Sequence, residues 1–170
     1  AMLVGRRIAG IQSADIIRLI RVLKRENSDI EVSGYAHGSL SSVLLCSAAF
    51  SDELTGIVLG SPYTSYFSIT ESRFYKPEFI MSSVAGALKH YDLPDLAASI
   101  APRKLFIANP FDAQRKNDNT DRIMADLSLI KSAYEAKSAV EHLKIVFCLD
   151  EDYYFYQLGE WLINNTEDHE

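Results

Sequence analysis

Residues Gly34-Tyr35-Ala36-His37-Gly38 have the spacing of a nucleophile elbow, the G-x-S-x-G turn that joins a strand to a helix. The central residue of such a turn has a strained backbone, and the flanking glycines avoid a clash with it. In this chain the central residue is Ala36, and a methyl group cannot attack a carbonyl carbon. The pattern therefore predicts an elbow that has lost its nucleophile.

The other serines and histidines suggest no replacement pair. His142 precedes the last expected strand, so it should lie at the opposite end of the sheet, and His169 is in the C-terminal tail. His90 is either a structural histidine or a residue of the ligand crevice. Three serines follow the elbow and should face the body of the next helix: Ser39, Ser41 and Ser42.

Four short apolar runs are typical of buried strands, and they alternate with stretches of helical length. The expected strands are Ile30–Gly34, Leu54–Leu59, Lys104–Ala108 and Leu143–Cys148. The expected helices cover residues 13–25, with Ser13 as N-cap, and residues 39–50, 79–89, 94–100, 120–138 and 154–164. This alternation predicts a single α/β domain over residues 1–170, a three-layer αβα arrangement around a mainly parallel sheet.

Residues 60–93 form an irregular, aromatic-rich insertion that leaves the carboxyl end of the second expected strand. Ligand crevices of open α/β sheets lie at such strand ends. Aromatic rings suit the apolar faces of sugars, so these rings either line a binding pocket or simply pack. The candidate binding residues are Tyr63, Tyr66, Phe67, Phe74, Tyr75 and His90.

Composition and charge narrow the function classes. The 170-residue chain has 17 Lys and Arg against 23 Asp and Glu, a net charge of -6, which argues against a nucleic-acid-binding protein. No apolar run reaches the roughly 18 residues that span a bilayer, so we expect no membrane partner. No phosphate-binding loop or metal-binding spacing occurs, and we expect no cofactor and no metal. Cys46 and Cys148 fit buried thiols, and the acidic triplet at 150–152 fits a solvated loop better than a cation site.

Several further segments carry a resemblance to a known family. The chain resembles the C-terminal half of an α/β-hydrolase domain, and in that superfamily the bacterial carbohydrate esterases that include acetyl xylan esterase-like proteins. The resemblance covers nearly the whole chain, and the run from His90 to Asp112 is its more specific part. It rests on Gly5-Arg6-Arg7, the elbow at 34–38, His90-Tyr91-Asp92-Leu93-Pro94-Asp95-Leu96, Ala101-Pro102-Arg103-Lys104-Leu105-Phe106-Ile107 and Asn109-Pro110-Phe111-Asp112.

The resemblance implies roles for particular positions. The family's nucleophile falls on Ala36, one oxyanion-hole N–H on His37 and the triad acid on Asp112. Its general-base histidine falls in the loop at 149–154, which contains no histidine. Because a catalytic triad needs all three groups, two of the three positions are unsuited to the chemistry. The missing histidine favours natural loss over an engineered Ser→Ala change, since an engineered trap would keep the base.

The resemblance also implies a partial α/β-hydrolase fold. The four expected strands correspond to the family's last four, so we expect a truncated fragment whose other strands come from the upstream half of the same polypeptide. One edge of Ile30–Gly34 then lacks a partner, and a bare edge invites pairing. We expect this edge to pair across a homodimer or to be covered by Gly5–Ile11 folded back. Secretion, usual for the related esterases, favours a secreted or periplasmic location.

The functional hypothesis is an α/β-hydrolase-like module that has lost catalysis. Such a pseudoenzyme would pack on an active partner domain or bind carbohydrate, including an acylated sugar, for it. The alternative is a genuine carboxylic-ester hydrolase whose nucleophile was mutated or whose site is completed by missing segments or a partner chain. A scaffold with no ligand is the third reading.

Overall fold

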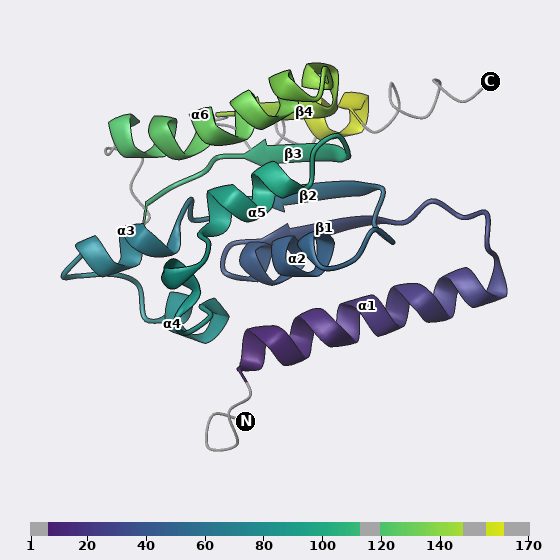
Figure 1. The fold of residues 1–170 in the computed structure, drawn as a ribbon, viewed down its shortest axis with the longest axis horizontal. Helices are drawn as coiled ribbons and strands as arrows, with labels where there is room; N and C mark the ends of the chain where they lie inside the picture. The colour runs from purple at the N-terminus through teal and green to yellow at the C-terminus, as the bar shows by residue number, and fades with distance from the viewer. Residues whose placement is uncertain (1–6, 113–119, 148–155, 162–170) are drawn as a thin grey trace.

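Four parallel strands form the sheet of the computed structural model, which describes residues 7–112, 120–147 and 156–161 (Figure 1). The strands lie in sequence order, β1-β2-β3-β4. They are β1 (Ser33–His37), β2 (Gly56–Gly60), β3 (Lys104–Ala108) and β4 (Leu143–Val146). β2 and β3 are buried along nearly their whole length, as parallel strands covered on both faces should be. The predicted α/β class with a mainly parallel sheet is confirmed.

Helices cover both faces of the sheet, in agreement with three layers. On one face α1 packs on α2, α2 on α5, and α5 on α6. On the other face the helical residues 156–161 contribute Trp161, whose ring centroid lies 5.5 Å from that of Phe106 in β3. The bounds of the four main helices are Ile8–Glu26 for α1, Leu40–Ala49 for α2, Leu93–Ser99 for α5 and Thr120–Ala136 for α6.

The first helix, α1, begins five residues before its expected start. Ser13 was expected to cap it, but Ser13 is buried inside the helix and its hydroxyl donates to the carbonyl of Val43 in α2 at 3.0 Å. The prediction of an N-cap was wrong because this hydroxyl finds an acceptor on another helix. The bond holds α1 beside α2.

Residues 60–93 contain more regular structure than expected. Two short helices, α3 (Tyr66–Glu71) and α4 (Glu78–Ser82), lie beside the carboxyl ends of the strands (Figure 1), and the 3-10 helix η2 (Ala87–Lys89) follows. The helix expected over 79–89 is interrupted between α4 and η2. α4 ends where Ser83 takes an extended backbone, and Gly86 adopts φ +80° just before η2.

Strand β1 lies at Ser33–His37, three residues later than the expected Ile30–Gly34. A close cross-strand fit accompanies this register. A Cβ on Gly60 of β2 would stand 3.1 Å from both the Tyr35 hydroxyl and the His37 ring carbon Cδ2. The β1 side chains therefore lie over a glycine, which the local pattern of β1 alone does not reveal.

The amino ends of the strands are tied together around Arg103, which precedes β3. Another 3-10 helix, η3 (Val140–His142), lies at this end, and His142 Nδ1 is 2.6 Å from the Pro102 carbonyl oxygen. His142 is therefore remote from the carboxyl ends of the strands, as expected. The Arg103 guanidinium donates at 2.6–3.2 Å to the carbonyls of Ala48, Ser51 and Leu54.

Candidate functional site

Strands β1, β2 and β3 end in the same backbone turn. The residue after each strand has a positive φ: +60° at Gly38, +46° at Ser61 and +49° at Asn109. Each of these residues donates its N–H to the carbonyl of the final residue of the next strand, at 2.7–2.9 Å. Positive φ is uncommon for serine and asparagine, so the loops that leave this edge of the sheet start from an unusual, repeated conformation.

The nucleophile position, Ala36, lies inside β1 and opposite Leu59. The parallel ladder continues past it, because the Gly38 N–H still bonds to β2. The positive φ falls on Gly38, two residues later than the elbow motif predicts. The backbone at Ala36 is therefore extended strand, which corrects the expectation of a strained turn there.

Ala36 and His37 point to opposite faces of the sheet. Ala36 packs against the core on the side of α2, whereas the His37 ring lies over Gly60 on the other face. Backbone groups also alternate along a parallel strand, and Gly38 bonds to β2. The backbone N–H of His37, the expected oxyanion donor, is therefore directed toward the outer edge of β1.

A groove of about 580 Å³ runs between α1, β1 and α2. Two of the predicted site residues, Ala36 and His37, border the groove, although their side chains lie on opposite faces of the sheet. Side chains of α1, which the sequence analysis did not connect with the site, also line it. The groove is lined by Gln12, Asp15, Ile16, Tyr35, Ala36, His37, Leu40, Val43 and Leu44. Most of these side chains are apolar, so the groove favours an apolar ligand surface.

The outer edge of β1 is open within the described part of the chain, where β1 pairs with β2 alone. By the same alternation, Ser33, Tyr35 and His37 direct their N–H and C=O groups outward. Large apolar side chains accompany this edge: Leu40 is 54% exposed, and Ile16 of α1 also lines the groove. The groove thus combines unpaired backbone groups with an apolar wall.

Ile8–Ile11 do not fold back as a strand over the outer edge of β1. These residues form the first turn of α1, and a backbone in helical conformation cannot pair with β1 as a strand. Gly5 and Arg6 lie outside the described residues. The expectation that Gly5–Ile11 folds back along the edge is corrected for its helical part.

The aromatic segment divides into buried and exposed rings. Tyr63 and Tyr66 are buried, and Tyr63 packs on Phe79 with ring centroids 4.5 Å apart. Their faces are therefore not accessible to a sugar, which corrects the expectation for these two residues. Phe67 and Tyr75 are partly exposed.

Burial also changes the chemistry of the two tyrosines. It raises the pKa of Tyr63 to about 12, and hydrogen bonds with Ser42 and Ser82 oppose the rise. Burial likewise raises the pKa of Tyr66. Both hydroxyls therefore stay protonated at neutral pH and serve as structural hydrogen-bonding groups, for example between Tyr63 and Ser82 at 3.0 Å.

The remaining candidate residues lie on separate elements. Asp112 is partly buried and follows Phe111, which pairs with Tyr63 in an isolated bridge beyond β3 and β2. His90 is exposed at the end of η2. The loop at 149–154, Cys148, the acidic triplet and His169 lie outside the described residues.

The serines after β1 are used structurally, as expected. The Ser41 hydroxyl donates to the Ala36 carbonyl at 3.2 Å, and the Ser42 hydroxyl donates to the Ser39 carbonyl at 3.0 Å. Neither His37 nor His90 has a side-chain hydrogen bond to a described serine. The described part of the chain therefore assembles no serine–histidine pair at β1.

No family model matches this chain, and no curated protein sequence matches it. Within the described ranges, no helix is long and apolar enough to cross a membrane, and no three His, Cys, Asp or Glu side chains cluster as metal ligands.

Proposed function

We propose that the chain is a catalytically silent α/β-hydrolase-like module, related to the carbohydrate esterases, that binds a partner and does not cleave esters. The succession of β1, a glycine turn and α2, followed by three further parallel strands with Asp112 just beyond β3, supports the relationship. The observation that carries the loss of catalysis is Ala36, a methyl group where the family has its nucleophile.

The chemistry of the site argues against catalysis restored by a neighbouring side chain. Acyl transfer needs a hydroxyl in contact with an imidazole and a carboxylate that orients this imidazole. A hydroxyl introduced at residue 36 would lie on the α2 face of the sheet, whereas the His37 ring lies over Gly60 on the opposite face. Among the described residues, the His37 imidazole would therefore not lie beside such a hydroxyl as its general base.

Hydrolysis of 4-nitrophenyl acetate tests the loss of catalysis. We expect the wild-type chain and Ala36→Ser to be equally inert, at the rate of Ala136→Ser, a matched change on the exposed end of α6. Turnover by the wild-type chain, or by Ala36→Ser alone, would overturn the proposal. The second result would identify a working esterase with a damaged nucleophile.

The proposed binding role rests on the open edge of β1. An added strand would pair with the outward groups of Ser33, Tyr35 and His37, and its alternate apolar side chains would enter the groove beside Ile16 and Leu40. We place this strand in another segment of a longer polypeptide. A second copy fits less well as the source of this strand. Its β1 would bring its own α2 onto the same face of the sheet, where α1 of the first copy already lies.

Amide hydrogen exchange and light scattering test this role together. In a monomeric chain the amides of Ser33, Tyr35 and His37 should exchange much faster than those of Gly34 and Ala36, which bond to β2. A dimer in which these three amides are protected would show that a second copy is the partner. A monomer with all five amides protected would show that the edge is already covered.

Carbohydrate is a second proposed ligand, favoured by the exposed rings of Phe67, Phe74 and Tyr75 beside the strand ends. Titration with acetylated xylo-oligosaccharides tests it. Phe74→Ala should weaken binding several-fold, whereas Phe50→Ala, on an equally exposed ring at the end of α2, should not. Absence of binding at millimolar oligosaccharide would contradict this second role.

A further inference from the structure

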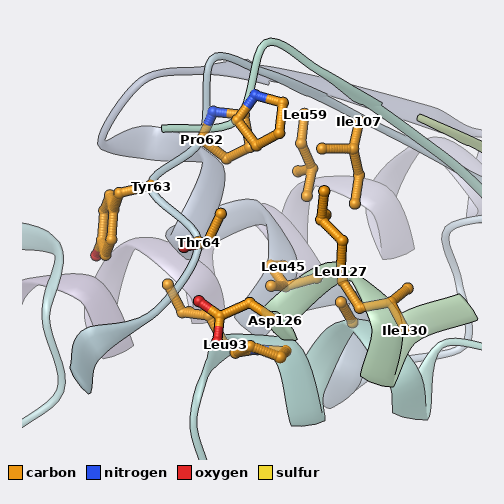
Figure 2. A pocket seen from close by; sticks show the side chains of 13 residues that line it. Leu45, Leu59, Pro62, Tyr63, Thr64, Leu93, Ile107, Asp126, Leu127 and Ile130 are labelled. Atoms are coloured by element: carbon orange, nitrogen blue, oxygen red, sulfur yellow. The ribbon is translucent and has the colours of Figure 1, made fainter. Parts of the chain in front are cut away.

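A small cavity of about 30 Å³ lies between the loop after β2, α5 and α6 (Figure 2). It is separate from the groove at β1. Its walls are apolar apart from two polar side chains, Thr64 from the loop and Asp126 from α6. The apolar lining includes Leu45, Leu59, Leu93, Ile107, Leu127 and Ile130.

The two polar side chains have unused hydrogen-bonding atoms. Thr64 and Asp126 are each only 9% exposed. Thr64 Oγ1 and Asp126 Oδ2 have no hydrogen-bond partner among the described residues. Leaving a buried hydroxyl or carboxylate oxygen without a partner destabilises a protein substantially, so a third group is needed between them.

The charge of Asp126 is already partly compensated. Its other oxygen, Oδ1, lies 3.5 Å from Nε of Arg122 in an ion pair, and the Arg122 guanidinium stacks 4.5 Å above the centroid of Phe67. A neutral ligand that both donates and accepts hydrogen bonds therefore suits the cavity better than a cation. Its size agrees, since a cavity needs roughly 10–15 Å³ to hold one water molecule.

We propose that this cavity is a binding site for one ordered water molecule, which accepts a hydrogen bond from Thr64 Oγ1 and donates one to Asp126 Oδ2. The water joins the loop that leads from β2 into α3 to the first turns of α6. It thereby helps to hold Phe67 of α3 under Arg122 of α6. This inference does not depend on the proposed loss of catalysis or on the open edge of β1.

A crystal structure at about 1.8 Å resolution is the direct test. We expect a density peak at hydrogen-bonding distance, about 2.6–3.2 Å, from both Thr64 Oγ1 and Asp126 Oδ2. Thr64→Val keeps the shape of the side chain but removes the hydroxyl, so the peak should disappear. An empty cavity in the wild-type protein would overturn the proposal.

Thermal unfolding supplies the second measurement. Thr64→Val should lower Tm by roughly 3–10 °C, because Asp126 Oδ2 loses its bridged partner. The matched control is Thr70→Val at an exposed position of α3, which should change Tm by less than about 2 °C. Equal shifts in the two variants, or a Tm of the wild type that rises specifically with potassium or ammonium, would contradict a bound water.

Discussion

The backbone N–H of Tyr66 donates to the carboxylate of Asp92 at 2.6 Å, across 26 residues of sequence. The same carboxylate accepts from Phe67 N–H at 3.0 Å and from Leu93 N–H at 2.7 Å. Asp92 therefore caps both α3 and α5, and it closes the aromatic segment into a loop at the carboxyl ends of the strands. Asp95 completes the capping box by accepting the Asp92 N–H at 2.8 Å.

Removal of this shared cap should be costly. Asp92→Ala leaves the N–H groups of two helices without their acceptor, and we expect the free energy of unfolding to fall by about 2–3 kcal/mol. Asp95→Ala removes only the exposed hydrogen bond from the Asp92 N–H, and it should lower the free energy of unfolding by about 1 kcal/mol. Urea unfolding of both variants provides the comparison, and equal losses would show that Asp92 caps α5 alone.

Stability should decrease in alkali because of Tyr63. Burial raises its pKa in the folded protein to about 12, from an ordinary value of 10.0. The folded state therefore keeps a proton that the unfolded state releases, so the stabilisation is complete below pH 10 and is lost as the pH rises to about 12. For this shift the loss is about 2–3 kcal/mol.

Denaturant unfolding from pH 9 to pH 12 measures this effect. Tyr63→Phe should show a smaller decrease of stability over this range than the wild-type protein. Tyr75→Phe, on a partly exposed ring, is the control for losing a tyrosine hydroxyl. Parallel profiles for Tyr63→Phe and the wild type would contradict the assignment to Tyr63.

Two glycines should respond in opposite ways to alanine. A Cβ on Gly34 in β1 would stand 2.7 Å from Cδ1 of buried Leu44, so Gly34→Ala should destabilise the fold by about 1–3 kcal/mol. A Cβ on Gly10 in α1 meets nothing within 4 Å, and Gly10→Ala should stabilise the helix by about 0.5–1 kcal/mol. Chemical unfolding distinguishes them, and a neutral Gly34→Ala would show that β1 does not pack on α2 in this way.

The apolar wall of the groove should tolerate polar substitution. Leu40→Ser replaces a groove side chain that is largely exposed, and it should change stability by no more than about 0.5 kcal/mol. Leu45→Ala, in the core of α2, should cost about 2–5 kcal/mol. A loss at Leu40 as large as at Leu45 would mean that this wall is covered in solution.

Local sequence patterns determined several elements closely. The strand expected at Lys104–Ala108 has those bounds in the structure, and the helix expected over 94–100 is found at Leu93–Ser99. The apolar run of β3 is bounded on both sides by turn residues. The start of α5 is marked by Asp92 and Pro94, whose preferences for the first helical turn are intrinsic. Such elements depend on neighbours within a few residues, so the sequence alone predicts them.

Long-range packing decided the rest. The Tyr35 and His37 side chains of β1 lie over Gly60 in the neighbouring strand, and the turn falls at Gly38 instead of Ala36. Tyr63 is a core residue because Phe79, more than a dozen residues away, packs on its ring, and Tyr66 in turn packs on Tyr63. The groove and the Thr64–Asp126 cavity likewise join segments that are distant in sequence. Their geometry follows from which surfaces meet after folding, and no local pattern contains that information.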